Sequence, residues 1–162
     1  MNPTKNRYYR QNTGNIIIVL STVFSFFLYF TNTSFSQDTV EKKFGKNGNI
    51  ITETPYSNGK INGMVKYYYQ NGTLRFEAQY TDGKINGNVK YYYSNDTLLY
   101  ESVYVNGKKN GALKYYDEKG QLVSETPYTD DKKNGMVKYY DKNGKLISET
   151  LYENDQKAPS QK

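Results

Sequence analysis

Carboxylates, lysines and tyrosines carry nearly all the reactive groups of this sequence. Its 162 residues include 16 acidic residues, 22 lysines and arginines and 19 tyrosines, but no histidine and no cysteine. Without histidine the usual proton shuttle near neutral pH is absent, and without cysteine there is no thiolate nucleophile, disulfide or thiolate zinc ligand. Catalysis by a serine–histidine–aspartate triad is excluded, and so is a zinc site built on histidines. Any enzyme built from this chain would have to use carboxylates, lysines or tyrosines alone.

A carboxylate-only hydrolase needs two acids about 5–10 Å apart with different pKa values. The glutamates instead recur at intervals of 24 residues, at Glu53, Glu77, Glu101, Glu125 and Glu149. Lysines recur at the same interval, at Lys42, Lys66, Lys90, Lys114 and Lys138. A regular series of glutamates, each with its own lysine, lacks the asymmetric acid pair that catalysis requires. We expect no catalytic residue, no cofactor and no metal ion.

The tyrosines follow the same 24-residue interval. Single tyrosines recur at Tyr56, Tyr80, Tyr104, Tyr128 and Tyr152, and tyrosine pairs recur at residues 67–68, 91–92, 115–116 and 139–140. We expect these rings to supply the packing that aliphatic side chains give in a larger core. One exposed row is the candidate contact surface for a partner, assigned to Tyr68, Tyr92, Tyr116 and Tyr140. Whether this series or the one starting at Tyr67 faces outward depends on the strand register.

Short β-hairpins are the elements that must position these side chains. Runs of strand-forming residues alternate with turn residues, and the Asn-Gly dipeptides at residues 62–63, 86–87, 110–111 and 134–135 are 24 residues apart each time. Such self-similarity is typical of stacked repeats. The sequence therefore predicts an all-β protein in which repeated antiparallel hairpins form an elongated meandering sheet or rod. The repeat units lie near residues 43–55, 56–79, 80–103, 104–127 and 128–151.

The turn within each hairpin predicts which side chains meet. Asn71-Gly72 between two strand-forming runs favours a two-residue type I′ turn, which places Gln70 opposite Thr73 and Lys66 opposite Glu77. The same count pairs Lys42 with Glu53, Lys90 with Glu101, Lys114 with Glu125 and Lys138 with Glu149. We interpret these as structural cross-strand pairs that hold the register. A bulge at the glycine is the alternative geometry, and it would shift the partners by one residue.

The first 36 residues have the pattern of an export signal. Three cations precede an apolar run of fifteen residues, 16–30, which is followed by small polar residues. We expect a signal helix that is cleaved before Gln37, and an uncleaved membrane anchor is the alternative. The protein is then exported to the periplasm, the cell surface or the medium. The expected divisions are a signal peptide at residues 1–36, a linker at 37–42, the repeat domain at 43–152 and a disordered tail at 153–162.

The net charge of +6 does not indicate nucleic-acid binding. Half of it lies in the first 36 residues, which carry three basic residues and no acid. In the remainder, basic and acidic residues are interleaved rather than gathered into a cationic patch. We therefore expect no nucleic-acid partner.

One repeat unit carries a recognisable set of residues, namely Tyr56, Gly59, Lys60, Gly63, Tyr67, Tyr68, Gly72, Leu74 and Glu77. This pattern and its equivalents in the later units resemble the MORN-repeat variant of bacterial YwqK-type antitoxin proteins, over roughly residues 43–152. The sequence departs from the family pattern in two ways. Asp96 and Asp131 stand where glycine is expected, and the usual tryptophan position holds aliphatic side chains, at Val65, Val89, Leu113 and Val137.

The resemblance implies a non-enzymatic binding module or scaffold that neutralises or tethers a partner protein, such as a toxin. An export signal favours an immunity or adaptor role in the envelope over neutralisation in the cytoplasm. A cell-surface glycan or a membrane surface is the alternative partner, bound by the tyrosine rows and by lysines in the loops. These lysines are Lys60, Lys84, Lys108, Lys109, Lys132 and Lys133.

Overall fold

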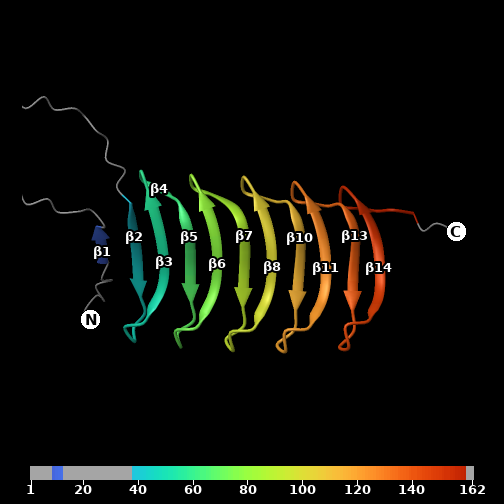
Figure 1. The fold of residues 1–162 in the computed structure, drawn as a ribbon, viewed down its shortest axis with the longest axis horizontal. Helices are drawn as coiled ribbons and strands as arrows, with labels where there is room; N and C mark the ends of the chain where they lie inside the picture. The colour runs from blue at the N-terminus through green and yellow to red at the C-terminus, as the bar shows by residue number, and fades with distance from the viewer. Residues whose placement is uncertain (1–8, 13–37, 160–162) are drawn as a thin grey trace, which may run out of the picture.

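The computed structural model describes residues 9–12 and 38–159, which form a single antiparallel sheet. The sheet has 15 strands, and successive hairpins pair side by side along the long axis of the molecule (Figure 1). This arrangement confirms the predicted all-β architecture with repeats of about 24 residues. The sheet is open, so it has two outer edges and two faces.

Ten strands make five hairpins: β2 (Thr39–Phe44), β3 (Ile50–Ser57), β5 (Gly63–Tyr68), β6 (Leu74–Thr81), β7 (Lys84–Tyr92), β8 (Leu98–Val105), β10 (Gly111–Tyr116), β11 (Leu122–Thr129), β13 (Gly135–Tyr140) and β14 (Leu146–Glu153). Two-residue strands follow four of the hairpins: β4 (Lys60–Ile61), β9 (Lys108–Lys109), β12 (Lys132–Lys133) and β15 (Gln156–Lys157). The remaining strand, β1 (Tyr9–Asn12), pairs with the outer edge of β2.

Most of the predicted export signal lies outside the described residues. Of residues 1–36 the structure describes 9–12, which form β1. Across the described parts of the chain, no helix is long and apolar enough to cross a membrane.

Two boundaries differ from the sequence prediction. Residues 39–42, predicted as linker, belong to β2 because they pair in register with β3. The predicted disordered tail begins with ordered residues, since Glu153 ends β14 and residues 156–157 form β15. Asn154 and Asp155 have positive φ values of 49° and 70°, so they close the same kind of tight turn that the earlier connectors use.

The turns inside the hairpins adopt the bulged alternative rather than the predicted type I′ geometry. Gly72 N donates to Tyr69 O at 3.0 Å and Tyr69 N donates to Thr73 O at 2.9 Å, so the loop has three residues and ends on Gly72 with φ of 89°. A second irregularity follows, because Tyr68 faces Leu74 while Tyr67 faces Phe76. The extra residue in β6 reverses the shift that the longer loop introduces. Lys66 therefore stands opposite Glu77.

Type I′ geometry occurs instead in the connectors between hairpins. Asn58 and Gly59 have φ values of 51° and 76° between the paired residues Ser57 and Lys60. Asp131, which replaces the expected glycine, has φ of 71°, and its Oδ1 accepts a hydrogen bond from Lys109 N at 2.8 Å. Aspartate tolerates this left-handed conformation better than most residues. The bond also ties this connector to the one before it.

A glycine is required where one hairpin follows the last. Gly135 has φ of 120°, and a Cβ placed on it would lie 2.9 Å from Pro127 Cγ of the preceding hairpin. Asn134 N donates to Pro127 O at 3.0 Å at the same point. The Asn-Gly dipeptides at residues 62–63, 86–87, 110–111 and 134–135 thus mark the close approach between hairpins, whereas Asn71-Gly72 lies in a hairpin tip.

Most of the buried side chains form one row on one face of the sheet, and the other two, Phe76 and Ser124, lie beside it. Successive members of this row stand opposite one another, as Val65 faces Ala78 and Ala78 faces Val89. The buried members of the row are Val65, Ala78, Val89, Ser102, Leu113 and Val137. Side chains packed around its first hairpins are Phe76, Ile61, Tyr80, Ile85, Tyr91 and Tyr104. Tyrosines thus help to cover the core in a protein whose described residues form a single sheet.

Ser102 tests how this row is stabilised. It is 2% exposed, and its Oγ has no hydrogen-bond partner among the described residues, whereas the equivalent residue one unit earlier is Ala78 at 0%. Ser102→Ala removes an unsatisfied buried hydroxyl, so the free energy of unfolding should rise by about 1 kcal/mol. Urea unfolding of the full chain measures this change. The matched control is Ser124→Ala, which should not stabilise, and a loss of stability in Ser102→Ala would contradict the explanation.

Candidate functional site

The two faces of the sheet carry different side chains because neighbouring residues of a strand point to opposite sides. We call the side with the buried row the core face. The other side, here the ladder face, carries the lysines and glutamates at the positions next to that row. Lys66 lies beside Val65 in β5, for example, and Glu77 lies beside Ala78 in β6.

The lysines and glutamates form one continuous row across ten strands, which we call the ladder. Within the hairpins, the paired residues are Lys42 with Glu53, Lys66 with Glu77, Lys90 with Glu101, Lys114 with Glu125 and Lys138 with Glu149. Between the hairpins, the pairs are Glu53 with Lys66, Glu77 with Lys90, Glu101 with Lys114 and Glu125 with Lys138. The sign of the charge therefore alternates from each strand to the next.

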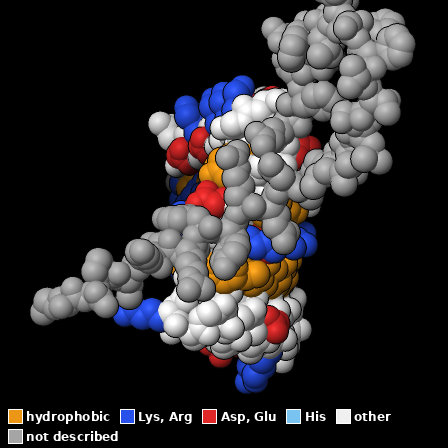
Figure 2. Space-filling model, turned by 90° about the vertical axis from the view of Figure 1, so that its left-hand side faces the viewer, with side chains coloured by type: hydrophobic (Ala, Val, Ile, Leu, Met, Phe, Trp, Pro, Cys, Tyr) orange, Lys and Arg blue, Asp and Glu red, His pale blue; other side chains and the backbone are white. Residues whose placement is uncertain are grey.

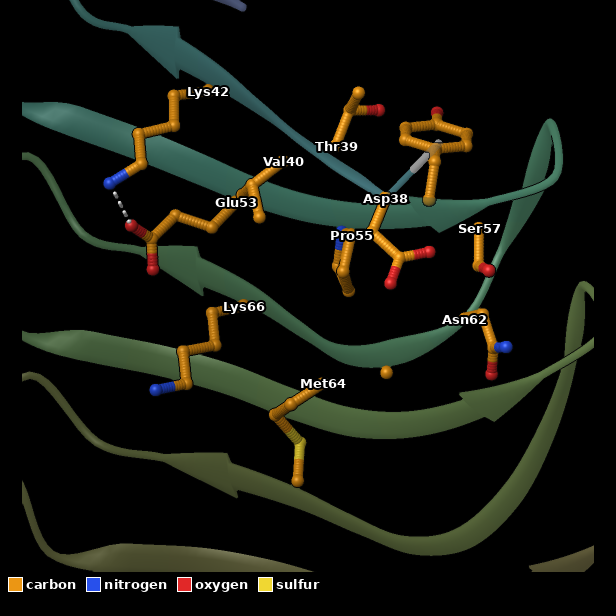
Figure 3. A pocket seen from close by; sticks show the side chains of 12 residues that line it. Asp38, Thr39, Val40, Lys42, Glu53, Pro55, Ser57, Asn62, Met64 and Lys66 are labelled. Carbon is orange, nitrogen blue, oxygen red and sulfur yellow. Dashed lines mark ion pairs between the residues drawn. The ribbon is translucent and has the colours of Figure 1, made fainter. Parts of the chain in front are cut away.

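At the first hairpin the ladder contacts are direct. Lys42 Nζ lies 2.9 Å from Glu53 Oε1 (Figure 3). The hydrogen bond from Lys42 lowers the pKa of Glu53, and the bond from Tyr68 also lowers it. Each ladder carboxylate has lysines as strand neighbours, so the acids share one kind of environment. Among the described residues, no group of three or more acids could hold a metal ion.

The candidate contact row of tyrosines lies on this face and is bound to the ladder. Tyr68 Oη donates to Glu53 at 2.8 Å, Tyr92 Oη to Glu77 at 2.8 Å and Tyr116 Oη to Glu101 at 2.9 Å. Each tyrosine reaches the glutamate of the hairpin before its own. Tyr140 occupies the equivalent place in β13 and is half-buried like the other three. The rings of Tyr68, Tyr92 and Tyr116 therefore join neighbouring hairpins.

The more exposed tyrosines belong to the other series, on the core face. Tyr67, Tyr115 and Tyr139 are 41%, 40% and 47% exposed. Together with Phe76 and Tyr100, rings of this series contact one another across five strands. The Tyr67–Phe76 and Tyr91–Tyr100 pairs are stacked at centroid separations of 5.1 Å and 4.5 Å, the Phe76–Tyr91 pair is edge-to-face at 4.6 Å, and the Tyr100–Tyr115 pair is tilted at 5.3 Å. We call this the aromatic row. It runs parallel to the buried row.

A second row of side chains, apolar at several positions, lies next to the ladder on the ladder face. It contains the residue two positions before each ladder lysine and the residue two positions after each ladder glutamate. Its exposed members are Val40, Met64, Val103, Met136 and Leu151, each between 37% and 41% exposed. We call these five side chains the apolar row. Seen from the end at which β2 lies, hydrophobic side chains gather in a band, and Lys, Arg, Asp and Glu side chains are scattered above and below it (Figure 2).

The surface is hollowed where the apolar row meets the ladder. A depression of about 690 Å³ lies over β2, β3 and β5, and Figure 3 shows Val40, Pro55 and Met64 along it, beside Lys42 and Lys66. A second depression, of about 240 Å³, is lined by Asn88, Glu101, Ser102, Val103, Ala112 and Lys114. Five of these six side chains are the equivalents, two units further along, of residues that line the first. The hollow is thus a property of the repeat rather than of one hairpin.

Sequence comparison identifies the family of this repeat. Four consecutive segments match the model of the MORN repeat variant, at residues 61–82, 85–106, 109–130 and 133–154. The chain belongs to the MORN repeat variant family. Each match spans one hairpin, and together the four cover more than half of the chain. No curated protein matches this sequence.

A MORN repeat points to a binding or scaffold role, since MORN-repeat proteins are in general non-catalytic binding modules. In this MORN-repeat protein, sequence reasoning identified the ladder residues but missed the apolar row. The signal was available in part, because Met64 and Met136 both lie two residues before a ladder lysine. Two of the equivalent positions hold Asn88 and Ala112, so the repetition of apolar types is incomplete.

The ladder makes a prediction about stability. Lys90 lies between Glu77 and Glu101, so Lys90→Glu places three like charges side by side. The free energy of unfolding should fall by about 1–2 kcal/mol, and added salt should recover part of the loss. The control is Lys84→Glu, the same charge change in the same strand opposite Thr81, which should cost less than about 0.5 kcal/mol. Equal losses in the two variants, measured by urea unfolding, would show that the ladder adds nothing.

The tyrosine bonds make a prediction about pH. Burial, helped by the bond to the glutamate, raises the pKa of Tyr68 and of Tyr116 to about 12. In the unfolded chain these groups titrate near 10, so stability is complete below about pH 10 and is lost as pH rises toward 12. Tyr68→Phe with Tyr116→Phe should remove two late-titrating hydroxyls from the tyrosinate absorbance curve and reduce the loss of stability above pH 10. A difference curve centred near pH 10 would refute the assignment.

Proposed function

We propose that this MORN-repeat protein is a non-enzymatic, exported scaffold that binds a partner protein on its ladder face. The observation that carries the proposal is the apolar row, whose five members recur beside an alternating ladder of charges between β2 and β14. Protein interfaces combine apolar centres with polar, hydrogen-bonding rims. A repeat sheet also offers an extended surface on which each unit adds the same contacts.

The ladder restricts what the partner looks like. The charge of the ladder alternates in sign from strand to strand and repeats every two strands. A complementary partner presents alternating charges beside an apolar ridge. A mismatched partner would place like charges together, which costs several kcal/mol. The tyrosines that donate to the ladder glutamates hold these carboxylates in place before a partner arrives. Such preorganisation lowers the entropy cost of binding.

The resemblance to YwqK-type antitoxins supports a neutralising role for this binding. The signal-like pattern of residues 1–36 supports export, so the proposed partner is met in the envelope or outside the cell. An immunity or tethering protein of the cell surface combines the two. An uncleaved signal would leave the same scaffold anchored at the membrane.

A cell-surface glycan is the second candidate partner, and the aromatic row favours it. Aromatic faces stack on sugar rings, and Tyr67, Tyr115 and Tyr139 are exposed on the core face. Two of the six loop lysines are less available for a membrane surface, because Lys109 Nζ lies 4.9 Å from the ring centre of Tyr128 and Lys133 Nζ lies 5.2 Å from that of Tyr152. The two candidate partners therefore use opposite faces of the sheet.

Matched variants of the two faces distinguish the candidates. The first carries Met64→Glu, Val103→Glu and Met136→Glu on the ladder face, and the second carries Tyr67→Glu, Tyr115→Glu and Tyr139→Glu on the core face. Crosslinking of the full chain in its native envelope should yield a protein adduct that falls at least about tenfold in the first variant and persists in the second. Persistence of every adduct in the first variant would contradict the ladder-face proposal. Retention on purified cell-wall polysaccharide that the second variant alone loses would favour the glycan.

A further inference from the structure

The outer edge of β14 is open over most of its length. On one side β14 pairs with β13, and on the other it pairs within the described residues only with β15, at Tyr152 and Glu153. Leu146, Ile147 and Leu151 along this strand are 41%, 63% and 41% exposed. A long strand edge with exposed apolar side chains is a template for pairing with another strand.

The junctions between hairpins show what such a strand must contain. At each of the four junctions, the ladder glutamate in the second strand of one hairpin faces the ladder lysine in the first strand of the next hairpin. The residue before that glutamate faces the residue after that lysine, as Ser124 faces Tyr139 where Glu125 faces Lys138. At the open edge, these two positions are Ser148 and Glu149. The strand that best complements the edge of β14 is therefore the first strand of a hairpin, with a lysine at the ladder position.

The opposite end of the sheet supplies such a strand. β2 is the first strand of its hairpin, its ladder residue is Lys42, and the residue after it is Lys43. If β2 followed β14 in the register of the four junctions, Lys42 would face Glu149 and Lys43 would face Ser148. β2 and β14 lie at opposite ends of the molecule (Figure 1), so this β2 has to come from a second copy of the chain.

In the full chain the outer edge of β2 is already occupied. β1 pairs with it at four positions, from Tyr9 opposite Lys42 to Asn12 opposite Thr39. β1 lies within residues 1–36, the segment whose removal the export proposal includes. Loss of that segment would leave β2 as an open edge that matches the open edge of β14.

We propose that β1 caps the sheet against self-association and that its removal lets copies join head to tail, β14 of one against β2 of the next. The removal step rests on the proposed export and cleavage, whereas the edge match rests on the register alone. The contact is heterologous, so it repeats without closing and makes linear rods with a continuous ladder. Lys42 and Glu149 decide the register because they are the charged pair at each joint.

Sedimentation of the full chain before and after cutting tests the cap. A specific protease site is inserted between Gln37 and Asp38, and the folded chain is then cut. The uncut protein should be monomeric, and the cut protein should form a concentration-dependent series of oligomers. Glu149→Lys should weaken this association at least tenfold, while the control Glu153→Lys, an equal charge change opposite Gln156 of β15, should leave it unchanged. A cut protein that stays monomeric, or an uncut protein that associates equally well, would overturn the proposal.

Disulfide trapping tests the register, because the chain has no cysteine of its own. After cutting, Lys42→Cys mixed with Glu149→Cys should give disulfide-linked heterodimers on mild oxidation, since paired strands bring Cα atoms within the range of a disulfide. Lys42→Cys mixed with Glu125→Cys, whose position is paired on both sides, should not. Equal yields from the two mixtures would overturn the joint. Trapped dimers without any partner adduct would defeat only the binding proposal, and partner adducts without dimers would defeat only this one.

Discussion

One register, repeated from hairpin to hairpin, determines every surface of this protein. A three-residue turn shifts each strand pair by one residue, and an extra residue in the second strand shifts it back. Because the two shifts cancel, Val65 meets Ala78 on one side of the sheet while Lys66 meets Glu77 on the other. A net slip of one residue would bring the charges to the core face and the valines to the ladder face. The ladder, the buried row and the aromatic row are therefore consequences of the same compensation.

The single sheet explains the composition of the chain. With no second layer among the described residues, each buried aliphatic side chain is covered by side chains of its own face. Tyrosine suits this task, because its ring covers the core while its hydroxyl reaches water or an acceptor at the rim. On the ladder face the same residue type has another use, since its hydroxyl links one hairpin to the glutamate of the previous one. The abundance of tyrosine thus reflects two structural roles.

The repeat, its period and the all-β meander could be predicted from the sequence because self-similarity records them directly. The pairing of Lys66 with Glu77 could also be predicted, although the prediction rests on a type I′ turn in the hairpin. That turn type occurs in the connectors between hairpins instead. Turn type depends on the local balance between loop length and bulge, which a single Asn-Gly dipeptide does not determine. The outward face of the tyrosine pairs was not predictable for a related reason. Tyr67 and Tyr68 are adjacent, and only the three-dimensional contacts show that Tyr68 bonds to Glu53 while Tyr67 is exposed.

The regularity of the ladder also limits how a partner can be positioned along it. A displacement by one hairpin, two strands or roughly 10 Å, brings a lysine onto the place of a lysine and a glutamate onto that of a glutamate. A partner shorter than the sheet would therefore have several nearly equivalent binding positions along the ladder and could move from one to the next. The departures from exact repetition, such as Asn88 and Ala112 where another unit has methionine, are what distinguish one binding position from the next. The side chains that depart from the repeat therefore determine where along the sheet a partner binds.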